Sequence, residues 1–147
     1  MNLCIDIGNS RTKFGIFEDD KLITVYNDID ELSVDYTNDD FNSVIISSVK
    51  KEIPEIIFDF TKAVSLVVVL DFNTILPIKI NYDTPETLGM DRVAAAVGAN
   101  YLFPNENCIV IDAGTCITMD FISSENEFLG GNISPGIYTR IRAMHRF

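Results

Sequence analysis

Three short blocks of hydrophobic and β-branched residues, separated by polar turns, open the chain. Residues 2–7 and 12–17 predict two strands of a hairpin, and residues 21–26 predict a third antiparallel strand. The turn between the first two begins with Gly8-Asn9, a pair that accepts the positive φ angles of tight hairpins. The segment that follows, to residue 42, is polar and predicts a loop.

Strands and helices alternate through the rest of the chain. We expect strands at 43–49 and 65–71, helices at 51–62 and 90–103, a hairpin of 108–112 with 116–122, a strand at 128–133 and a helical start at 137–145. Pro54 is tolerated because it falls in the first turn of its helix. This order of elements predicts an α/β fold.

One short sequence motif occurs twice, each time at the end of a hydrophobic strand. Asp6-Ile7-Gly8 and Asp112-Ala113-Gly114 are 106 positions apart, and Thr12 is followed at the same interval by Thr118. The repeat predicts a duplicated α/β architecture, with a first domain over 1–105 and the beginning of a second over 106–147. A full second domain would need on the order of 100 further residues, so we expect about one and a half domains.

Composition and charge narrow the class of protein. The chain has 147 residues, of which 47% are hydrophobic and 22% are charged, as in soluble globular domains. A net charge of −11 argues against a nucleic-acid partner, and the run Leu66 to Leu70 is too short to cross a membrane. We therefore expect a cytoplasmic protein with no membrane or nucleic-acid partner. Cys4, Cys108 and Cys116 lie in or beside apolar strands and predict small buried thiols.

The turn after the first strand has the residues of a phosphate site. Successive backbone N–H groups can converge there on an anion, and Gly8 permits its close approach. Asp6 could hold Mg²⁺, while Ser10, Thr12 and Lys13 supply donors for phosphate oxygens. Such turns also occur purely as structure. The second copy at Asp112 favours the functional interpretation.

A third group of polar residues precedes the alanine-rich helix. Thr84 to Arg92 forms a turn that places Asp91 and Arg92 in the first helical turn, where the dipole favours an anion. Asp91 is interpreted as the group that accepts or orients a substrate hydroxyl proton, and Arg92 as a grip on an acidic substrate. The alternative is that Asp91 only stabilises the helix start.

Four segments together resemble the type III pantothenate kinases. They are Asp6-Ile7-Gly8-Asn9-Ser10, the segment Thr84 to Arg92, the segment Asp112 to Asp120, and Gly130 to Gly136. The resemblance spans the chain and implies a ribonuclease-H-like (actin-like ATPase) duplicated fold, with its first half complete and its second half partial. It also implies ATP-dependent phosphorylation of pantothenate, the first step of coenzyme A synthesis, by a cytoplasmic homodimer that uses Mg²⁺ and a monovalent cation, K⁺ or NH₄⁺.

The resemblance also assigns roles to single residues. Asp91 would be the proton acceptor, Asp112 would bind the monovalent cation, and Asp6 would bind Mg²⁺ through the phosphates. The ATP phosphates would lie on a segment with a contact from the second half: Asp6, Ile7, Gly8, Asn9, Ser10, Arg11, Thr12, Lys13 and Thr115. Pantothenate would contact a second group: Tyr82, Gly89, Met90, Asp91 and Arg92. The glycines of Gly130 to Gly136 are interpreted as bounding the nucleotide cleft.

Two alternatives remain open. A sugar or acetate kinase of the same superfamily fits the Asp-Gly turns but does not explain Thr84 to Arg92. A non-catalytic nucleotide-binding protein, which regulates or assembles with partners, fits an incomplete second half. Members of the family continue beyond this length, and we expect the 147-residue polypeptide alone to turn over slowly or not at all.

Overall fold

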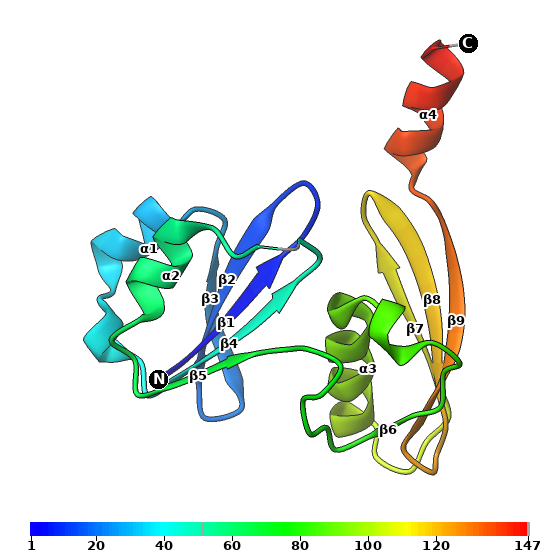
Figure 1. Cartoon of the computed structure of the whole chain (residues 1–147), viewed down its shortest axis with the longest axis horizontal. Helices are drawn as coiled ribbons and strands as arrows, with labels where there is room; N and C mark the ends of the chain where they lie inside the picture. The colour runs from blue at the N-terminus through cyan, green and yellow to red at the C-terminus, as the bar shows by residue number, and fades with distance from the viewer. Residues whose placement is uncertain (51, 147) are drawn as a thin grey trace. The chain divides into compact units, whose positions relative to one another are not determined.

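A five-stranded sheet forms the first of two compact units, which are Met1–Asp71 and Phe72–Phe147 (Figure 1). The computed structural model describes residues 1–50 and 52–146. The first sheet has the order β3-β2-β1-β4-β5. Its strands are β1 (Asn2–Ile7), β2 (Thr12–Glu18), β3 (Lys21–Tyr26), β4 (Ser43–Ser48) and β5 (Leu66–Val69). The first three are antiparallel, whereas β4 runs parallel to β1 and β5 runs parallel to β4.

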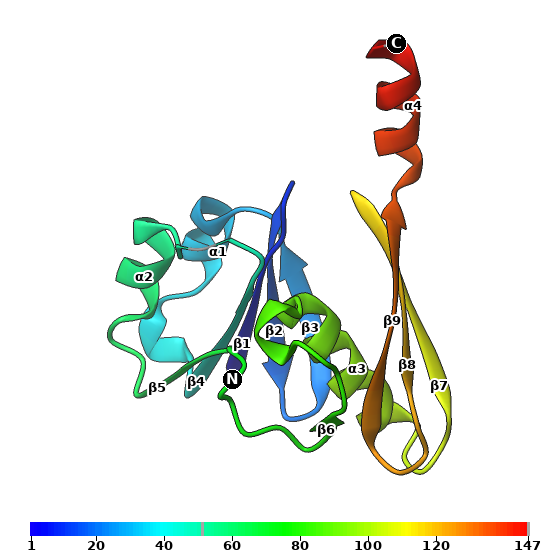
Figure 2. The same cartoon turned by 45° about the vertical axis from the view of Figure 1, so that its right-hand side comes forward.

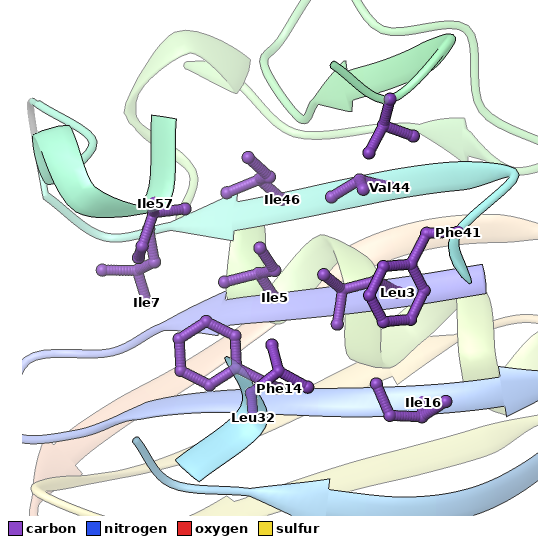
Figure 3. Close-up of a cluster of buried hydrophobic side chains, with 11 residues drawn as sticks. Leu3, Ile5, Ile7, Phe14, Ile16, Leu32, Phe41, Val44, Ile46 and Ile57 are labelled. Atoms are coloured by element: carbon purple, nitrogen blue, oxygen red, sulfur yellow. The ribbon is translucent and has the colours of Figure 1, made fainter. Parts of the chain in front are cut away.

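One face of this sheet carries the hydrophobic core of the first unit. Alternate residues of β1, namely Leu3, Ile5 and Ile7, are buried, as the two-residue period of a strand requires (Figure 3). Leu32 and Ile57 come from the two helices and join the same cluster. These helices are α1 (Ile29–Asp35) and α2 (Glu55–Thr61), and both cover the same face of the sheet (Figure 2).

The polar segment before β4 is not a loop throughout, so that prediction was wrong. It contains α1 and the 3₁₀ turn η1 (Asn38–Asp40). Asp28 caps α1 by accepting the Asp30 N–H at 2.7 Å, and Leu32 is its only buried residue. Tyr26 donates to Asp35 at 2.6 Å, and this bond raises the pKa of Tyr26 to about 12. A seven-residue helix with one buried side chain leaves almost no periodic signal in the sequence.

The helix expected over 51–62 is shorter in the structure. Pro54 is the N-cap residue of α2, which runs Glu55–Thr61. A proline in this place loses no intrahelical hydrogen bond, because the first N–H groups of a helix have no partner within it. Lys51, the first residue of the predicted helix, lies outside the described residues.

The second unit repeats the antiparallel beginning of the first. Strands β7 (Cys108–Ala113), β8 (Cys116–Ile122) and β9 (Glu127–Pro135) form a meander, and β6 (Lys79–Ile80) adds to β9 in parallel, giving the order β6-β9-β8-β7. Helices α3 (Met90–Leu102) and α4 (Ile137–Arg146) and the 3₁₀ turn η2 (Pro85–Thr87) complete the unit. The two-residue strand β6 was not predicted. The other strands and the two α-helices of this unit confirm the sequence prediction within a few residues.

The boundary between the units falls elsewhere than the expected division after residue 105. Helix α3 packs against β7 and β8 within the second unit. Its buried Val93 and Ala96 share a cluster with Ile122 and Phe128, which ties the helix to the sheet that follows it. The duplication of two ribonuclease-H-like domains with a boundary at 105 stays a prediction. The α/β class is confirmed.

Within the described residues, no helix is long and apolar enough to cross a membrane.

The two repeated hairpins differ in register by one residue. Asp6 is paired with Lys13 across β1 and β2, whereas Asp112 is paired with Thr118 across β7 and β8. Thr12 lies opposite Ile7, whereas Thr118, its counterpart in the repeat, lies opposite Asp112. Equivalent residues of the two repeats therefore have different cross-strand partners. A one-residue shift moves side chains to the other face of a sheet, so the two aspartates have different cross-strand neighbours.

Candidate active site

The turn between β1 and β2 keeps its polar residues accessible. The Gly8 N–H donates to the Arg11 carbonyl at 3.0 Å, which closes the turn. A Cβ atom at Gly8 would lie 3.1 Å from that carbonyl oxygen, so the position favours glycine. Asn9, Ser10 and Arg11 are exposed. The closed turn presents its outer atoms to solvent, as a phosphate site requires.

Asp6 and Lys13 lie side by side on the face of the sheet opposite the hydrophobic core. They are paired in register, and Asp6 is half-buried between the buried Ile5 and Ile7. Alternation along β1 directs Asp6 away from the face that α1 and α2 cover. Beside a glycine turn, the carboxylate can act as a metal ligand, and the ammonium group can donate hydrogen bonds to phosphate oxygens. The residues present therefore fit a magnesium nucleotide.

Asp91 lies where the sequence predicted, in the first turn of α3. Its Oδ1 accepts the Arg92 N–H at 2.9 Å, and its side chain is half-buried. Gly89 is the N-cap residue, and a Cβ atom there would lie 2.4 Å from the same Oδ1. The glycine thus leaves the space into which the carboxylate folds. Met90, which follows it, packs against the core of the second unit.

Arg92 is buried and paired with a carboxylate of its own chain. Its Nε donates to both oxygens of Asp120, at 3.1 and 2.9 Å, and its Nη2 also donates to Asp120 Oδ1. The side chains are 7% and 2% exposed. Hydrogen bonding to Asp120 raises the pKa of Arg92, and Tyr82 adds to this effect. The guanidinium also lies 5.9 Å from the centre of the Phe128 ring.

This pair adds a residue that sequence reasoning did not assign. In the sequence, Asp120 is only the last position of the segment Asp112 to Asp120, and its spacing from Arg92 gives no periodic signal. Tyr82 packs edge-on against Phe128 with ring centres 6.3 Å apart. The structure therefore brings the predicted residues Tyr82 and Arg92 together with Asp120 in one cluster. Whether Arg92 contacts a substrate stays a prediction.

The second Asp-Gly turn holds the start of α4. The carbonyl of Thr115 accepts the Gly136 N–H at 2.9 Å and the Thr139 hydroxyl at 2.7 Å. Asp112 and Thr115 are exposed near the same end of the β7–β8 hairpin.

The three cysteines differ in burial. Cys116 is exposed, which contradicts the expectation of a buried thiol there, while Cys4 and Cys108 are half-buried. Burial raises the pKa of Cys4.

The later glycines serve close backbone contacts inside the second unit. A Cβ atom at Gly131 would lie 1.9 Å from the Met119 carbonyl oxygen, and one at Gly136 would lie 2.1 Å from the Gly114 carbonyl oxygen. Gly130 has a φ of +91° and faces the ring of Tyr82. These contacts give a local reason for each glycine, and their place at a nucleotide cleft stays a prediction.

Two alanine substitutions are expected to change stability in opposite directions. Gly131→Ala should lower the free energy of unfolding by about 1–3 kcal/mol, because backbone must move to admit the methyl group. Gly98→Ala should raise it by about 0.5–1 kcal/mol, because Gly98 is interior to α3 and no heavy atom lies within 4 Å of its added Cβ. Urea unfolding followed by circular dichroism measures both. A loss of stability in Gly98→Ala would contradict the open surroundings of that position.

The chain combines an α/β fold, an Asp-Gly turn at the end of a strand and a carboxylate at a helix start. The chain belongs to the type III pantothenate kinase family, whose pattern matches residues 2–147.

Individual relatives agree with this assignment. A type III pantothenate kinase from Bacteroides fragilis strain YCH46 is 40% identical over 151 residues, which cover 100% of this chain and 62% of the relative. One from Cytophaga hutchinsonii is 41% identical over 149 residues, with the same shares covered. The chain thus spans about 62% of the length of these relatives.

A solved structure supports the fold alone. A candidate N-acetylglucosamine kinase from Porphyromonas gingivalis superimposes with a TM-score of 0.51 at 13% sequence identity. The match covers 90% of this chain and 47% of the other. The two chains are therefore alike in fold.

Proposed function

We propose that the native protein transfers the γ-phosphoryl group of ATP to the 4′-hydroxyl of pantothenate, the first step of coenzyme A synthesis. The observation that carries this proposal is the start of α3. There Gly89 leaves room for the Asp91 carboxylate, and Arg92 is fixed beside it by Asp120. This segment belongs to a chain that the pantothenate kinase family matches over residues 2–147.

The turn after β1 is the proposed site of the ATP phosphates. Backbone N–H groups of the turn after Gly8, from Asn9 to Thr12, and the Lys13 ammonium would donate to the phosphate oxygens, Gly8 would permit their close approach, and Asp6 would hold Mg²⁺ through them. Thr115 would add a contact from the second hairpin, and Asp112 would hold K⁺ or NH₄⁺. Bound Mg²⁺ would neutralise charge on the transferred group. Phosphoryl transfer needs mainly such positioning and charge stabilisation.

Asp91 is the proposed proton acceptor. As the pantothenate hydroxyl oxygen bonds to the γ-phosphorus, the bond from that phosphorus to the bridging oxygen of ADP breaks, and the hydroxyl proton passes to Asp91. Tyr82, Gly89, Met90 and Arg92 would hold the acceptor substrate. A base is needed only late in such a reaction, when the hydroxyl has become acidic, so an aspartate carboxylate can accept the proton.

An acceptor panel tests the proposal against its alternatives. The native protein is incubated with ATP, Mg²⁺ and K⁺, and ADP formation is followed with pantothenate, N-acetylglucosamine or acetate as acceptor. We expect turnover with pantothenate alone. Turnover with a sugar or acetate would favour another kinase of the superfamily. Tight ATP binding without transfer to any of the three would favour the non-catalytic alternative. Cytoplasmic location and homodimer formation belong to the same proposal.

A further inference from the structure

The hydroxyl of Ser47 is buried without a hydrogen-bond partner. Its residue is 7% exposed, and Ser47 Oγ is the one buried side-chain polar atom left unpaired among residues 1–50 and 52–146. Native structures rarely leave such atoms unpaired, because burial removes their hydrogen bonds to water. An orphaned hydroxyl therefore calls for a ligand or a functional reason.

Ser47 lies beside Asp6 at the end of two parallel strands. It is the penultimate residue of β4, and it is paired in register with Asp6, the penultimate residue of β1. Adjacent strands lie about 4.8 Å apart, which makes the two side chains neighbours. Leu3 and Ile5 are paired with the buried Val44 and Ile46, so alternation places Asp6 and Ser47 together on the opposite face.

The surrounding groups satisfy one another without using Ser47. Ser48 Oγ accepts the Lys50 N–H at 3.0 Å and donates to the Lys50 carbonyl at 3.2 Å. The Val49 N–H continues the parallel ladder by donating to the Ile7 carbonyl at 3.0 Å. The carboxyl ends of parallel strands are also the edge at which α/β sheets bind ligands. Ser47 thus combines an unused donor with the location of a ligand site.

We propose that Ser47 is a further residue of the nucleotide site, whose hydroxyl donates a hydrogen bond to an oxygen of the magnesium phosphate group held by Asp6. The proposal rests on the proposed function, since it assumes a nucleotide at this turn. A serine hydroxyl can donate to an anionic oxygen while it also accepts from a neighbour. The bound nucleotide would supply the partner that the chain itself does not.

Ser47→Ala separates this role from a structural one. Removing an unpaired hydroxyl should leave the melting temperature of the nucleotide-free native protein unchanged or higher. The same change should weaken binding of a magnesium complex of a non-hydrolysable ATP analogue by about 10- to 100-fold, because hydrogen bonds to charged groups are strong. Calorimetric titration and thermal melting measure the two effects without relying on catalysis.

Ser43 provides a matched control on the same strand and face. Its hydroxyl is already used, since it donates to Asn2 Oδ1 at 2.9 Å. Ser43→Ala should lower the melting temperature and leave the affinity for the analogue within about twofold. Equal affinity of Ser47→Ala and wild type, or a lower melting temperature in Ser47→Ala, would overturn the inference. Failure of wild type to bind the analogue would instead overturn the proposed function.

Discussion

Asp91→Asn is expected to remove pantothenate phosphorylation while the protein keeps its affinity for magnesium ATP. Asparagine retains the Oδ1 atom that accepts the Arg92 N–H at 2.9 Å, so the start of α3 should keep its geometry. It cannot accept a substrate proton as a carboxylate does. Loss of general base catalysis lowers turnover by roughly 10²- to 10⁴-fold.

The measurement pairs steady-state turnover with calorimetric binding of magnesium ATP. Asp39→Asn is the control, since Asp39 is an exposed carboxylate in η1 that has no proposed role. It should leave both quantities within about twofold. Turnover in Asp91→Asn within threefold of wild type would exclude Asp91 as the proton acceptor, and Asp91 would then be only a helix-start residue.

Asp120→Ala is expected to destabilise the second unit by about 3–5 kcal/mol. The substitution leaves the guanidinium of Arg92 buried without its carboxylate, and an uncompensated buried charge is costly. Hydrogen exchange of amides in α3 and β8 measures the opening free energy of this unit itself. A change below about 1 kcal/mol would show that water solvates Arg92 once Asp120 is gone.

Two controls separate burial from charge pairing. Lys79 donates to Glu127 at 2.6 Å on the surface, where the lysine side chain is 70% exposed. Lys79→Ala should therefore cost no more than about 1 kcal/mol. The double substitution Arg92→Met with Asp120→Leu should recover much of the stability, because it removes both buried charges together. It should not restore turnover if Arg92 holds the substrate.

The hydrophobic pattern was sufficient to predict most of the strands of the two sheets. The hairpin of β1 and β2 and that of β7 and β8 were predicted because each pairs adjacent segments through a short turn containing glycine. Helix α3 was also predicted, since its alanine-rich sequence is long enough to favour a helix on its own. The repeated Asp-x-Gly motif predicted the location of the candidate phosphate turn.

Other features depend on packing that no local pattern encodes. The two residues of β6 pair with β9, which lies far along the chain from β6. Arg92 and Asp120 meet only because α3 packs against β8. The resemblance assigned Arg92 to the substrate, and it could not reveal this internal partner. Likewise, the orphaned Ser47 hydroxyl became visible only when β4 was paired with β1.

Identification of the reaction product tests the central proposal most directly. The native protein is incubated with ATP, Mg²⁺, K⁺ and pantothenate, and phosphorus NMR follows the phosphate resonances. The account predicts one 4′-phosphopantothenate for each ADP formed, with no product in Asp91→Asn. ATP that is bound or hydrolysed while pantothenate remains unmodified would contradict it.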